Sequence, residues 1–164
     1  MLKILLATQT ELIVIQRLAH KIWPQTYATI LSKDQLDYML NKFYALDVLE
    51  QQMNNGHQFF LVEENDFHIG FLTIEHNCNA SQFTKIHKLY VLQSCQGKGI
   101  GKQLIDVAIK ESKIHNQKGL YLNVNKYNSA QLFYAKTGFK LLKEEVVAIG
   151  NNFVMDDFVM QLLF

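Results

Sequence analysis

The chain has 164 residues, of which 49% are apolar, and a formal net charge of +1 from 16 basic and 15 acidic side chains. This length predicts one domain, residues 1–164, with a substantial hydrophobic core, and the apolar and aromatic content excludes a disordered chain. The near-neutral balance gives no general electrostatic reason to bind nucleic acid or an anionic membrane.

No apolar run approaches the roughly 18 residues that a membrane span requires. The apolar stretch at residues 2–7 is too short for a signal peptide and lacks a basic lead-in and a cleavage site. The expected location is therefore the cytoplasm, with neither a membrane nor nucleic acid as a partner.

In the N-terminal third, the pattern predicts a strand followed by helices. Residues 3–7 predict the opening strand, and Thr10 is a candidate N-cap for a helix with apolar residues at helical spacing. Pro24 is expected to stop that helix by Trp23. Ser32 is expected to cap the next helix, because Ser-Lys-Asp-Gln at this point resembles a capping box.

The rest of the chain alternates strands with helices. The further expected helices are residues 47–53, 100–113 and 127–136. The further expected strands are residues 58–63, 68–76, 83–92, 120–124, 139–149 and 153–163. The last two strands are expected to form a hairpin over residues 150–152, which gives the order β-αα(α)-βββ-α-β-α-ββ.

Two cysteines and six histidines are the candidate redox and metal-binding groups. Cys78 and Cys95 are expected to be free thiols. Cys95 precedes a glycine-rich segment, but no histidine is placed by the sequence to activate it as a nucleophile. The histidines show no metal-binding spacing, so no metal site is expected.

The segment Gln96-Gly97-Lys98-Gly99-Ile100-Gly101-Lys102 joins a predicted strand to a predicted helix. Glycines let the backbone approach an anion closely, and the helix start adds unpaired N–H groups and the positive end of its dipole. The segment therefore predicts a phosphate site. A P-loop is excluded because glutamines stand at its first glycine and its Ser/Thr positions. A dinucleotide fingerprint is excluded because lysine stands at its third glycine position.

The same loop matches the Q/R-x-x-G-x-G/A signature of the GNAT acetyltransferases through Gln96, Gly99 and Gly101. A second segment resembles the other half of the GNAT pattern, a strand, an Asn-led helix with a tyrosine, and Gly-Phe, carried by residues 122–125, 128–130 and 133–139. The order and separation of the two motifs are those of the family. The resemblance covers the chain from about residue 59 onwards, and its two ends are also similar to bacterial GNATs that acetylate polyamines.

The resemblance implies an α/β (α+β) fold, with a mixed, mostly antiparallel twisted sheet of roughly six to seven strands and helices on both faces. It implies transfer of the acetyl group of acetyl-CoA, as co-substrate, to a primary amine by direct attack in a ternary complex, without a metal. The alternatives are a protein or peptide N-acetyltransferase, and a non-catalytic acyl-CoA-binding regulatory module.

For coenzyme A, the resemblance implies that the strand before the loop splays from the next strand and that pantetheine lies between them. Its contacts would be backbone groups of Leu89, Tyr90 and Val91. The residues assigned to the pyrophosphate are Gln96, Gly97, Lys98, Gly99, Ile100, Gly101 and Lys102. Lys98 or Lys102 would add a charge contact, or be an ordinary solvated lysine. Asn128 is expected to contact the cofactor or to cap its helix.

Tyr134 stands where the family's tyrosine donates a proton to the departing thiolate, and a phenol with a pKa near 10 suits that task. The base is less clear, because many GNATs carry glutamate at positions that match Lys85 or His87. His87 is the candidate base, since an unperturbed histidine has a pKa near 6.5. Glu75 and a water molecule are the alternatives.

The acceptor pocket is expected to use Trp23, Tyr27, Tyr38 and Glu75, together with the carboxylates of residues 156–157, of which Asp156 is the principal candidate. Carboxylates in a pocket would suit a polycationic amine such as spermidine. The apolar residues 158–164 fit either a buried strand or pairing in a homodimer, and fold-level analogy favours the dimer.

Overall fold

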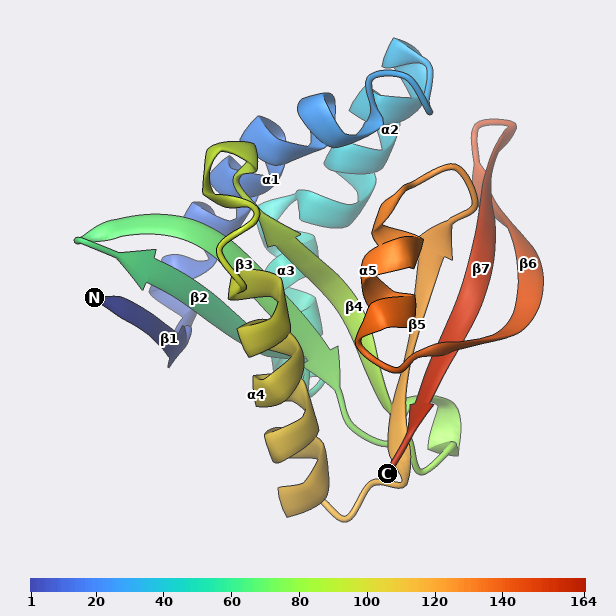
Figure 1. Ribbon diagram of the computed structural model, residues 1–164. Helices are drawn as coiled ribbons and strands as arrows, with labels where there is room; N and C mark the ends of the chain where they lie inside the picture. The colour runs from blue at the N-terminus through green and yellow to red at the C-terminus, as the bar shows by residue number, and fades with distance from the viewer.

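The computed structural model describes residues 1–164, and a single twisted seven-stranded sheet lies at its centre (Figure 1). The strands are β1 (Leu2–Leu6), β2 (Gln58–Glu64), β3 (Phe67–Glu75), β4 (Thr84–Val91), β5 (Gly119–Asn125), β6 (Lys140–Gly150) and β7 (Phe153–Leu163). Their order across the sheet is β1-β2-β3-β4-β5-β7-β6. Only β4 and β5 pair in parallel, and every other neighbouring pair is antiparallel.

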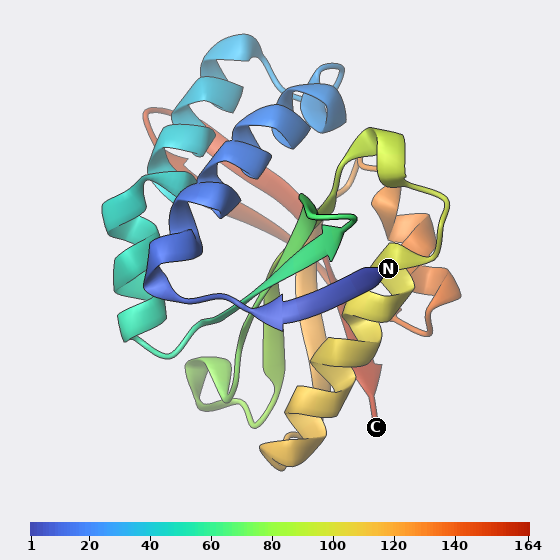
Figure 2. The same ribbon diagram turned by 90° about the vertical axis from the view of Figure 1, so that its left-hand side faces the viewer.

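Helices cover both faces of this sheet (Figures 1 and 2). They are α1 (Leu12–Tyr27), α2 (Lys33–Tyr44), α3 (Leu46–Asn54), α4 (Ile100–Ile114) and α5 (Ala130–Lys136). α1, α2 and α3 bury one apolar core against the sheet, and α4 and α5 bury a second core on the other face. The predicted class and layering are therefore confirmed. No helix combines the length and apolar composition needed to cross a membrane.

The first helix differs from the prediction at both ends. Thr10 is not its N-cap: it lies inside a short 3₁₀ turn, where the N–H of Thr8 donates to Glu11 Oε1 at 2.9 Å. Pro24 does not stop the helix, which continues to Tyr27. Proline removes only its own N–H, and both Pro24 and His20, whose carbonyl would have accepted it, lie on the exposed side of α1. The extra turn brings Tyr27 to the buried side.

The second helix fixes the C-terminal hairpin in place. Ser32 caps α2 as predicted, with its hydroxyl accepting from the N–H of Gln35 at 3.1 Å. The Gln35 side chain does not complete a capping box, because its Nε2 donates instead to the carbonyl of Val154 at 2.8 Å. One turn later the Tyr38 hydroxyl donates to the carbonyl of Ile149 at 2.6 Å. These two contacts join α2 to both strands of the β6–β7 hairpin.

A bulge in β4 reverses the alternation of its side chains. Ile86 pairs with Ile74 and Lys88 with Thr73 on β3, so His87 is an extra residue in β4. Before the bulge Ile86 belongs to the core beneath α4, and after it Leu89 and Val91 do. Lys88 and Tyr90 therefore face α1–α3, whereas unbroken alternation would have put Lys88 and Ile86 on one side.

We predict that Tyr38→Phe lowers the free energy of unfolding by about 1–2 kcal/mol, because the carbonyl of the buried Ile149 loses a donor. Denaturant unfolding followed by fluorescence measures this change. Tyr127→Phe is the matched control, because Tyr127 is 73% exposed and its removed hydroxyl makes no hydrogen bond to the protein. Equal effects of the two substitutions would contradict the proposed link between α2 and the hairpin.

Candidate active site

Strands β4 and β5 pair only from Thr84–Leu120 to Ile86–Leu122 and then diverge (Figure 1). Beyond this point each strand keeps its other neighbour, so the two facing edges leave backbone N–H and C=O groups unpaired with one another. A cavity of about 1120 Å³ opens at the divergence, lined by β4, β5, α1, α2, α5, a residue of α3, the start of α4 and the β6–β7 hairpin. The gap between two such edges can accept an extended ligand as an additional strand.

The glycine-rich loop lines this cavity between β4 and α4. Gly97 and Gly99 have φ values of +81° and +77°, a conformation that glycine adopts without strain. None of the backbone N–H groups of residues 97–102 has a hydrogen-bond acceptor in the protein. Gln96 anchors the loop through its Nε2, which donates to the carbonyl of Val91 at 3.2 Å. The free donors at the helix start form a site suited to phosphate.

The two lysines of the loop are paired within the protein. Lys98 lies 3.6 Å from Glu64 and its side chain is not part of the cavity lining, so its contribution to this site is limited to its backbone. Lys102 lines the cavity but also contacts Asp106 at 2.6 Å, one turn along α4. The anion site therefore depends mainly on backbone donors.

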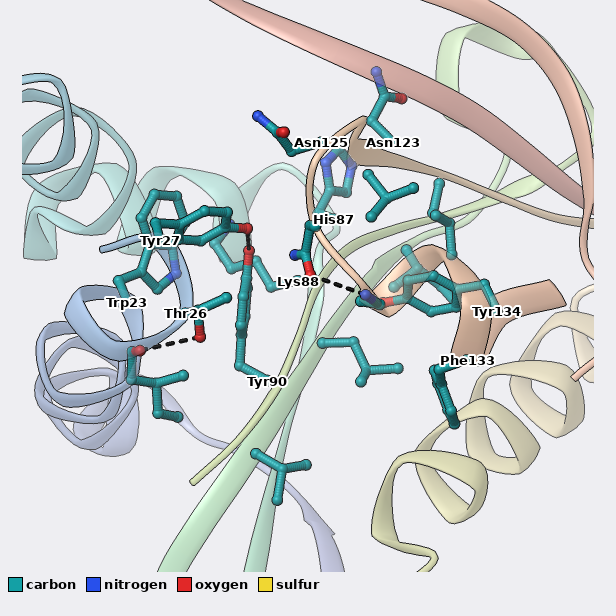
Figure 3. Close-up of a pocket in the computed structure, with 18 of the residues that line it drawn as sticks. Trp23, Thr26, Tyr27, His87, Lys88, Tyr90, Asn123, Asn125, Phe133 and Tyr134 are labelled. Carbon is teal, nitrogen blue, oxygen red and sulfur yellow. Dashed lines mark hydrogen bonds between the residues drawn. The ribbon is translucent and has the colours of Figure 1, made fainter. Parts of the chain in front are cut away.

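Tyr134 reaches the cavity from α5, on the opposite side from the aromatic residues of α1 (Figure 3). Its ring packs edge-on against Phe133 and Phe139 at centroid distances of 5.3 and 5.6 Å. Burial, and secondarily the proximity of Tyr27, raises the pKa of Tyr134 above the expected value near 10. The hydroxyl makes no hydrogen bond to the protein. It is therefore a protonated donor available to a ligand.

Asn128 starts α5 as a cap. Its side-chain oxygen accepts the N–H of Ala130 at 2.9 Å, so α5 starts at Ala130, three residues later than predicted. Asn128 also lines the cavity, so a contact with a ligand through its amide group is compatible with its capping role.

His87 lines the cavity at the β4 bulge, and Glu75 lies behind it. The distance from His87 Nε2 to Glu75 Oε1 is 2.9 Å. Burial, and then the charge of Lys85, lowers the pKa of His87 to about 3, in contrast to the value near 6.5 expected from the sequence. Burial raises the pKa of Glu75, but hydrogen bonds from Cys78 and His87 outweigh it, and the net pKa lies below the usual range. The pair is thus a neutral imidazole on a carboxylate.

The assignment of Glu75 to the acceptor pocket is wrong, because its carboxylate faces two histidines and does not line the cavity. A carboxylate only accepts, so His87 Nε2 carries the proton and Nδ1 has the lone pair. His57 also approaches Glu75, at 3.3 Å, and these three groups form a cluster that their sequence spacing does not reveal. The two imidazoles are stacked at 18°, so their nitrogen lone pairs run nearly parallel and do not converge on one ion.

Aromatic side chains form the wall of the cavity on the side of α1 (Figure 3). Trp23 and Tyr27 have ring centroids 4.8 Å apart, and the Tyr27 hydroxyl lies 2.9 Å from that of Tyr90 on β4. Both α1 residues that were predicted for the acceptor pocket line this cavity. Tyr38 is not in the lining, because its hydroxyl is directed to the hairpin instead.

The acidic residue of β7 that lines the cavity is Asp157, and the choice of Asp156 is wrong. Neighbouring side chains on a strand face opposite sides, and Asp156 is directed to Lys126, at 3.0 Å. Burial raises the pKa of Asp157. Asn123 Nδ2 donates to Asp157 at 3.3 Å and to Glu145 at 2.7 Å, so two carboxylates meet at this end of the cavity.

Comparison with known proteins assigns the chain to a family. The model described as "Acetyltransferase (GNAT) domain" matches residues 27–156, more than three quarters of the chain. The chain belongs to the GNAT acetyltransferase family. It is an enzyme, a GNAT-type N-acetyltransferase.

Relatives of the acetyltransferase are distant in sequence. An uncharacterized N-acetyltransferase in the pepI 3′ region of Lactobacillus delbrueckii subsp. lactis is 24% identical over 139 residues, 78% of this chain and 80% of that protein. The PaiA N-acetyltransferase from Thermoplasma acidophilum, solved in complex with coenzyme A, superposes with a TM-score of 0.82 at 23% identity, over 100% of this chain and 99% of that one. A spermidine N-acetyltransferase SpeG chimera from Vibrio cholerae and hSSAT superposes with a TM-score of 0.69 at 20% identity, over 99% and 95% of the two chains.

Several cavity residues of the acetyltransferase were not predicted. Lys88 was missed because the sequence pattern does not reveal the bulge that turns this residue towards α3. Tyr44 and Gln52 come from helices whose packing angles the sequence does not specify, and Asn123 and Glu145 come from separate strands. For Asn123 a signal existed, a polar residue in an otherwise apolar strand.

We predict that the free energy of unfolding of the acetyltransferase falls as the pH is lowered from about 6.5 towards 4. The folded-state pKa values of His87 and His76 are lowered to about 3 and about 4, chiefly by burial. Above the unfolded-state pKa near 6.5, both imidazoles are neutral in the folded and unfolded states and the free energy of unfolding is highest. As the pH falls below 6.5, each histidine lowers this free energy by at most about 1.4 kcal/mol per pH unit.

Denaturant midpoints measured across this pH range test the prediction. His87→Gln should flatten the profile, and replacement of the exposed His20 by Gln should leave its slope unchanged. A His87→Gln profile as steep as that of the wild type would contradict the expectation.

Proposed function

We propose that this acetyltransferase transfers the acetyl group of acetyl-CoA to a small primary amine by direct attack within a ternary complex. The observation that carries the proposal is the divergence of β4 from β5, with free N–H donors at the loop and a free tyrosine hydroxyl in the same cavity. The three features provide a strand-like slot, an anion site and a proton donor. The coenzyme A complex of the PaiA relative gives independent support for the co-substrate.

Backbone groups of Leu89, Tyr90 and Val91 would bind the pantetheine chain, because the edge of β4 that faces β5 is unpaired here. An N–H group aimed at the thioester oxygen would stabilise the negative charge that develops there, by roughly 3 kcal/mol. The N–H groups of residues 97–102 would hold the pyrophosphate at the positive end of α4.

Tyr134 would donate its proton to the departing thiolate. A raised pKa keeps the phenol protonated before the reaction. The same low-dielectric surroundings also raise the pKa of a thiol formed there, so the proton affinities of the two groups remain comparable. The proton is thus delivered where charge would otherwise accumulate.

The attacking amine must be neutral, and the pair His87–Glu75 is the candidate for removing its proton, either directly or through water. With Nε2 donating to Glu75, the Nδ1 lone pair of His87 is the accepting atom. Its low pKa makes His87 a relay to solvent rather than a lasting store for the proton.

For the acceptor, a polyamine is one candidate class, supported by the carboxylates of Asp157 and Glu145 in the cavity and by the fold shared with the spermidine N-acetyltransferase chimera. An amino group of a protein or peptide is the alternative. A thiol-release assay with acetyl-CoA against polyamines, amino acids, aminoglycosides and N-terminal peptides separates these classes. Failure of every amine, with acetyl-CoA still raising the melting temperature, would favour a binding module.

We predict that Tyr134→Phe lowers kcat by about 100-fold or more, the contribution typical of a general acid, and changes the affinity for coenzyme A little. Thiol release measures kcat, and isothermal titration calorimetry measures the affinity. Tyr127→Phe, an exposed tyrosine of the preceding loop, should retain wild-type kcat. A Tyr134→Phe enzyme with wild-type kcat would remove the proton-donor role.

The loop gives a second prediction: Gly99→Ala should weaken coenzyme A binding by about tenfold, since an L-residue at φ +77° shifts the free N–H groups. Gly56→Ala is the matched control, because Gly56 has φ +98°, equally open surroundings and no part in the cavity lining. Both substitutions should lower stability by about 1 kcal/mol, and only Gly99→Ala should change the affinity. Equal affinities of the two variants would count against the phosphate site.

A further inference from the structure

Lys88 is a buried amine without a carboxylate partner. It lies in the cavity wall, only 7% exposed, and no carboxylate lies within 4.0 Å of its Nζ. Its one hydrogen bond runs to the side-chain oxygen of Gln52 on α3, at 2.9 Å. Lysine is rarely buried without an anionic partner, so a group that supplies one is expected from outside the protein.

The surroundings of Lys88 are rich in donors and poor in acceptors. Its Nζ lies 5.5 Å from the ring centroid of Tyr44 and 5.7 Å from that of Phe59. The Tyr44 hydroxyl and the Trp23 indole N–H, both from residues that line the cavity, are buried without a hydrogen-bond partner. The amide nitrogen of Gln52, whose oxygen is held by Lys88, makes no hydrogen bond either. This end of the cavity therefore lacks the acceptor oxygens that an anion would bring.

The other end of the cavity has the opposite character. Asp157 and Glu145, joined through Asn123, lie on β7 and β6 beyond β5. Lys88 lies on β4, across the divergence of β4 from β5 and therefore on the other side of the cavity. A polyamine would satisfy only the acidic end. Only an acceptor that also carries a carboxylate would supply the missing acceptor oxygens beside Lys88.

We propose that the acceptor is an amino acid, a primary amine that also carries a carboxylate, and that Lys88 Nζ and Gln52 Nε2 bind this carboxylate. The proposal rests on the acetyl-transfer function inferred above. Lys88 precedes Tyr90 by two residues on the same face of β4, so one extended molecule with a carboxylate and a terminal amine, such as a diamino acid, would contact both residues. Such an acceptor would present that amine beside the backbone of Tyr90, where the thioester is placed.

The charge of Lys88 supports the same assignment. Burial, and then the neighbouring charge of Lys85, lowers the pKa of Lys88 to about 7. A carboxylate beside Nζ favours the charged form, so binding of the acceptor should take up protons between about pH 7 and 8.

The test compares acceptors that differ only in the carboxylate: ornithine with putrescine, and lysine with cadaverine. In the wild type, kcat/KM should be at least about tenfold higher for each amino acid than for its decarboxylated partner. In Lys88→Met that ratio should fall to about one. Lys42→Met is the matched control, since Lys42 also lies over a tyrosine ring, that of Tyr38, but is exposed and outside the cavity lining, so its loss should keep the ratio. Gln52→Leu, which keeps Lys88, should lower the ratio in part and serves if Lys88→Met does not fold.

Calorimetry with pentanoate, a carboxylate without an amine, separates the two levels of the proposal. We expect pentanoate to bind the wild type and not Lys88→Met, a result that would support the anion site whether or not any amine is acetylated. A failure to acetylate any amine would refute only the acetyl-transfer function. The anion site is overturned if pentanoate does not bind, or if Lys88→Met binds it as well as the wild type. The acceptor class is overturned if putrescine and cadaverine match or exceed the amino acids, or if the preference survives in Lys88→Met.

Discussion

One extra residue in β4 determines how the site is arranged. At His87 the strand carries a bulge against β3, and from there it no longer pairs with β5. A bulge increases local twist and bends its strand, which directs the end of β4 away from a parallel neighbour. The bend opens the slot in the sheet and the shift in alternation turns Lys88 and Tyr90 towards α1–α3. The proposed cofactor slot and the proposed acceptor wall thus have a common origin.

The polar part of the cavity carries several hydrogen-bond donors that have no acceptor in the protein. Loop N–H groups, the hydroxyls of Tyr134 and Tyr44, and the indole of Trp23 have no acceptor in the protein. Other polar groups around the cavity have partners within the protein: Lys98 and Lys102 contact carboxylates, and α2 supplies donors to hairpin carbonyls. Unpaired buried donors lower stability, so their concentration at one place indicates binding of oxygen-rich ligands. Phosphate, thioester and carboxylate groups are such ligands.

Rigid supports surround this unsatisfied region. α2 holds the β6–β7 hairpin, Gln96 ties the loop to the end of β4, and Asn128 caps α5 so that Tyr134 is directed inward. Glu75 fixes the orientation and tautomer of His87. Each of these polar side chains makes at least one hydrogen bond within the protein. A site held in this way meets its ligands with little reorganisation.

Some of the site was accessible from the sequence because it is local. The glycine loop, the helix that follows it and Tyr134 on the next helix lie in contiguous motifs, and the backbone conformations they need are encoded by the residues themselves. Trp23 and Tyr27 were also identified, although Tyr27 lies beyond the proline that was expected to end its helix. The strands were placed to within one or two residues, since apolar runs and turn residues mark their bounds.

What failed depended on contacts between distant segments. Asp156 and Asp157 differ only in the strand face they occupy, and the pairing of β7 with β5 and β6 selects Asp157. Glu75 contacts His87 because β3 and β4 are neighbours, and it also contacts His57. Burial in this cluster lowers the pKa of His87. The burial of Lys88 follows from the β4 bulge, which the residue types in this strand do not predict. The sequence alone thus determined the family, the conformation of the glycine-rich loop and the candidate proton donor Tyr134, because each depends on a short stretch of chain. Only the tertiary structure decided the faces, partners and charge states of the residues that line the cavity, because register and desolvation are properties of the assembled sheet.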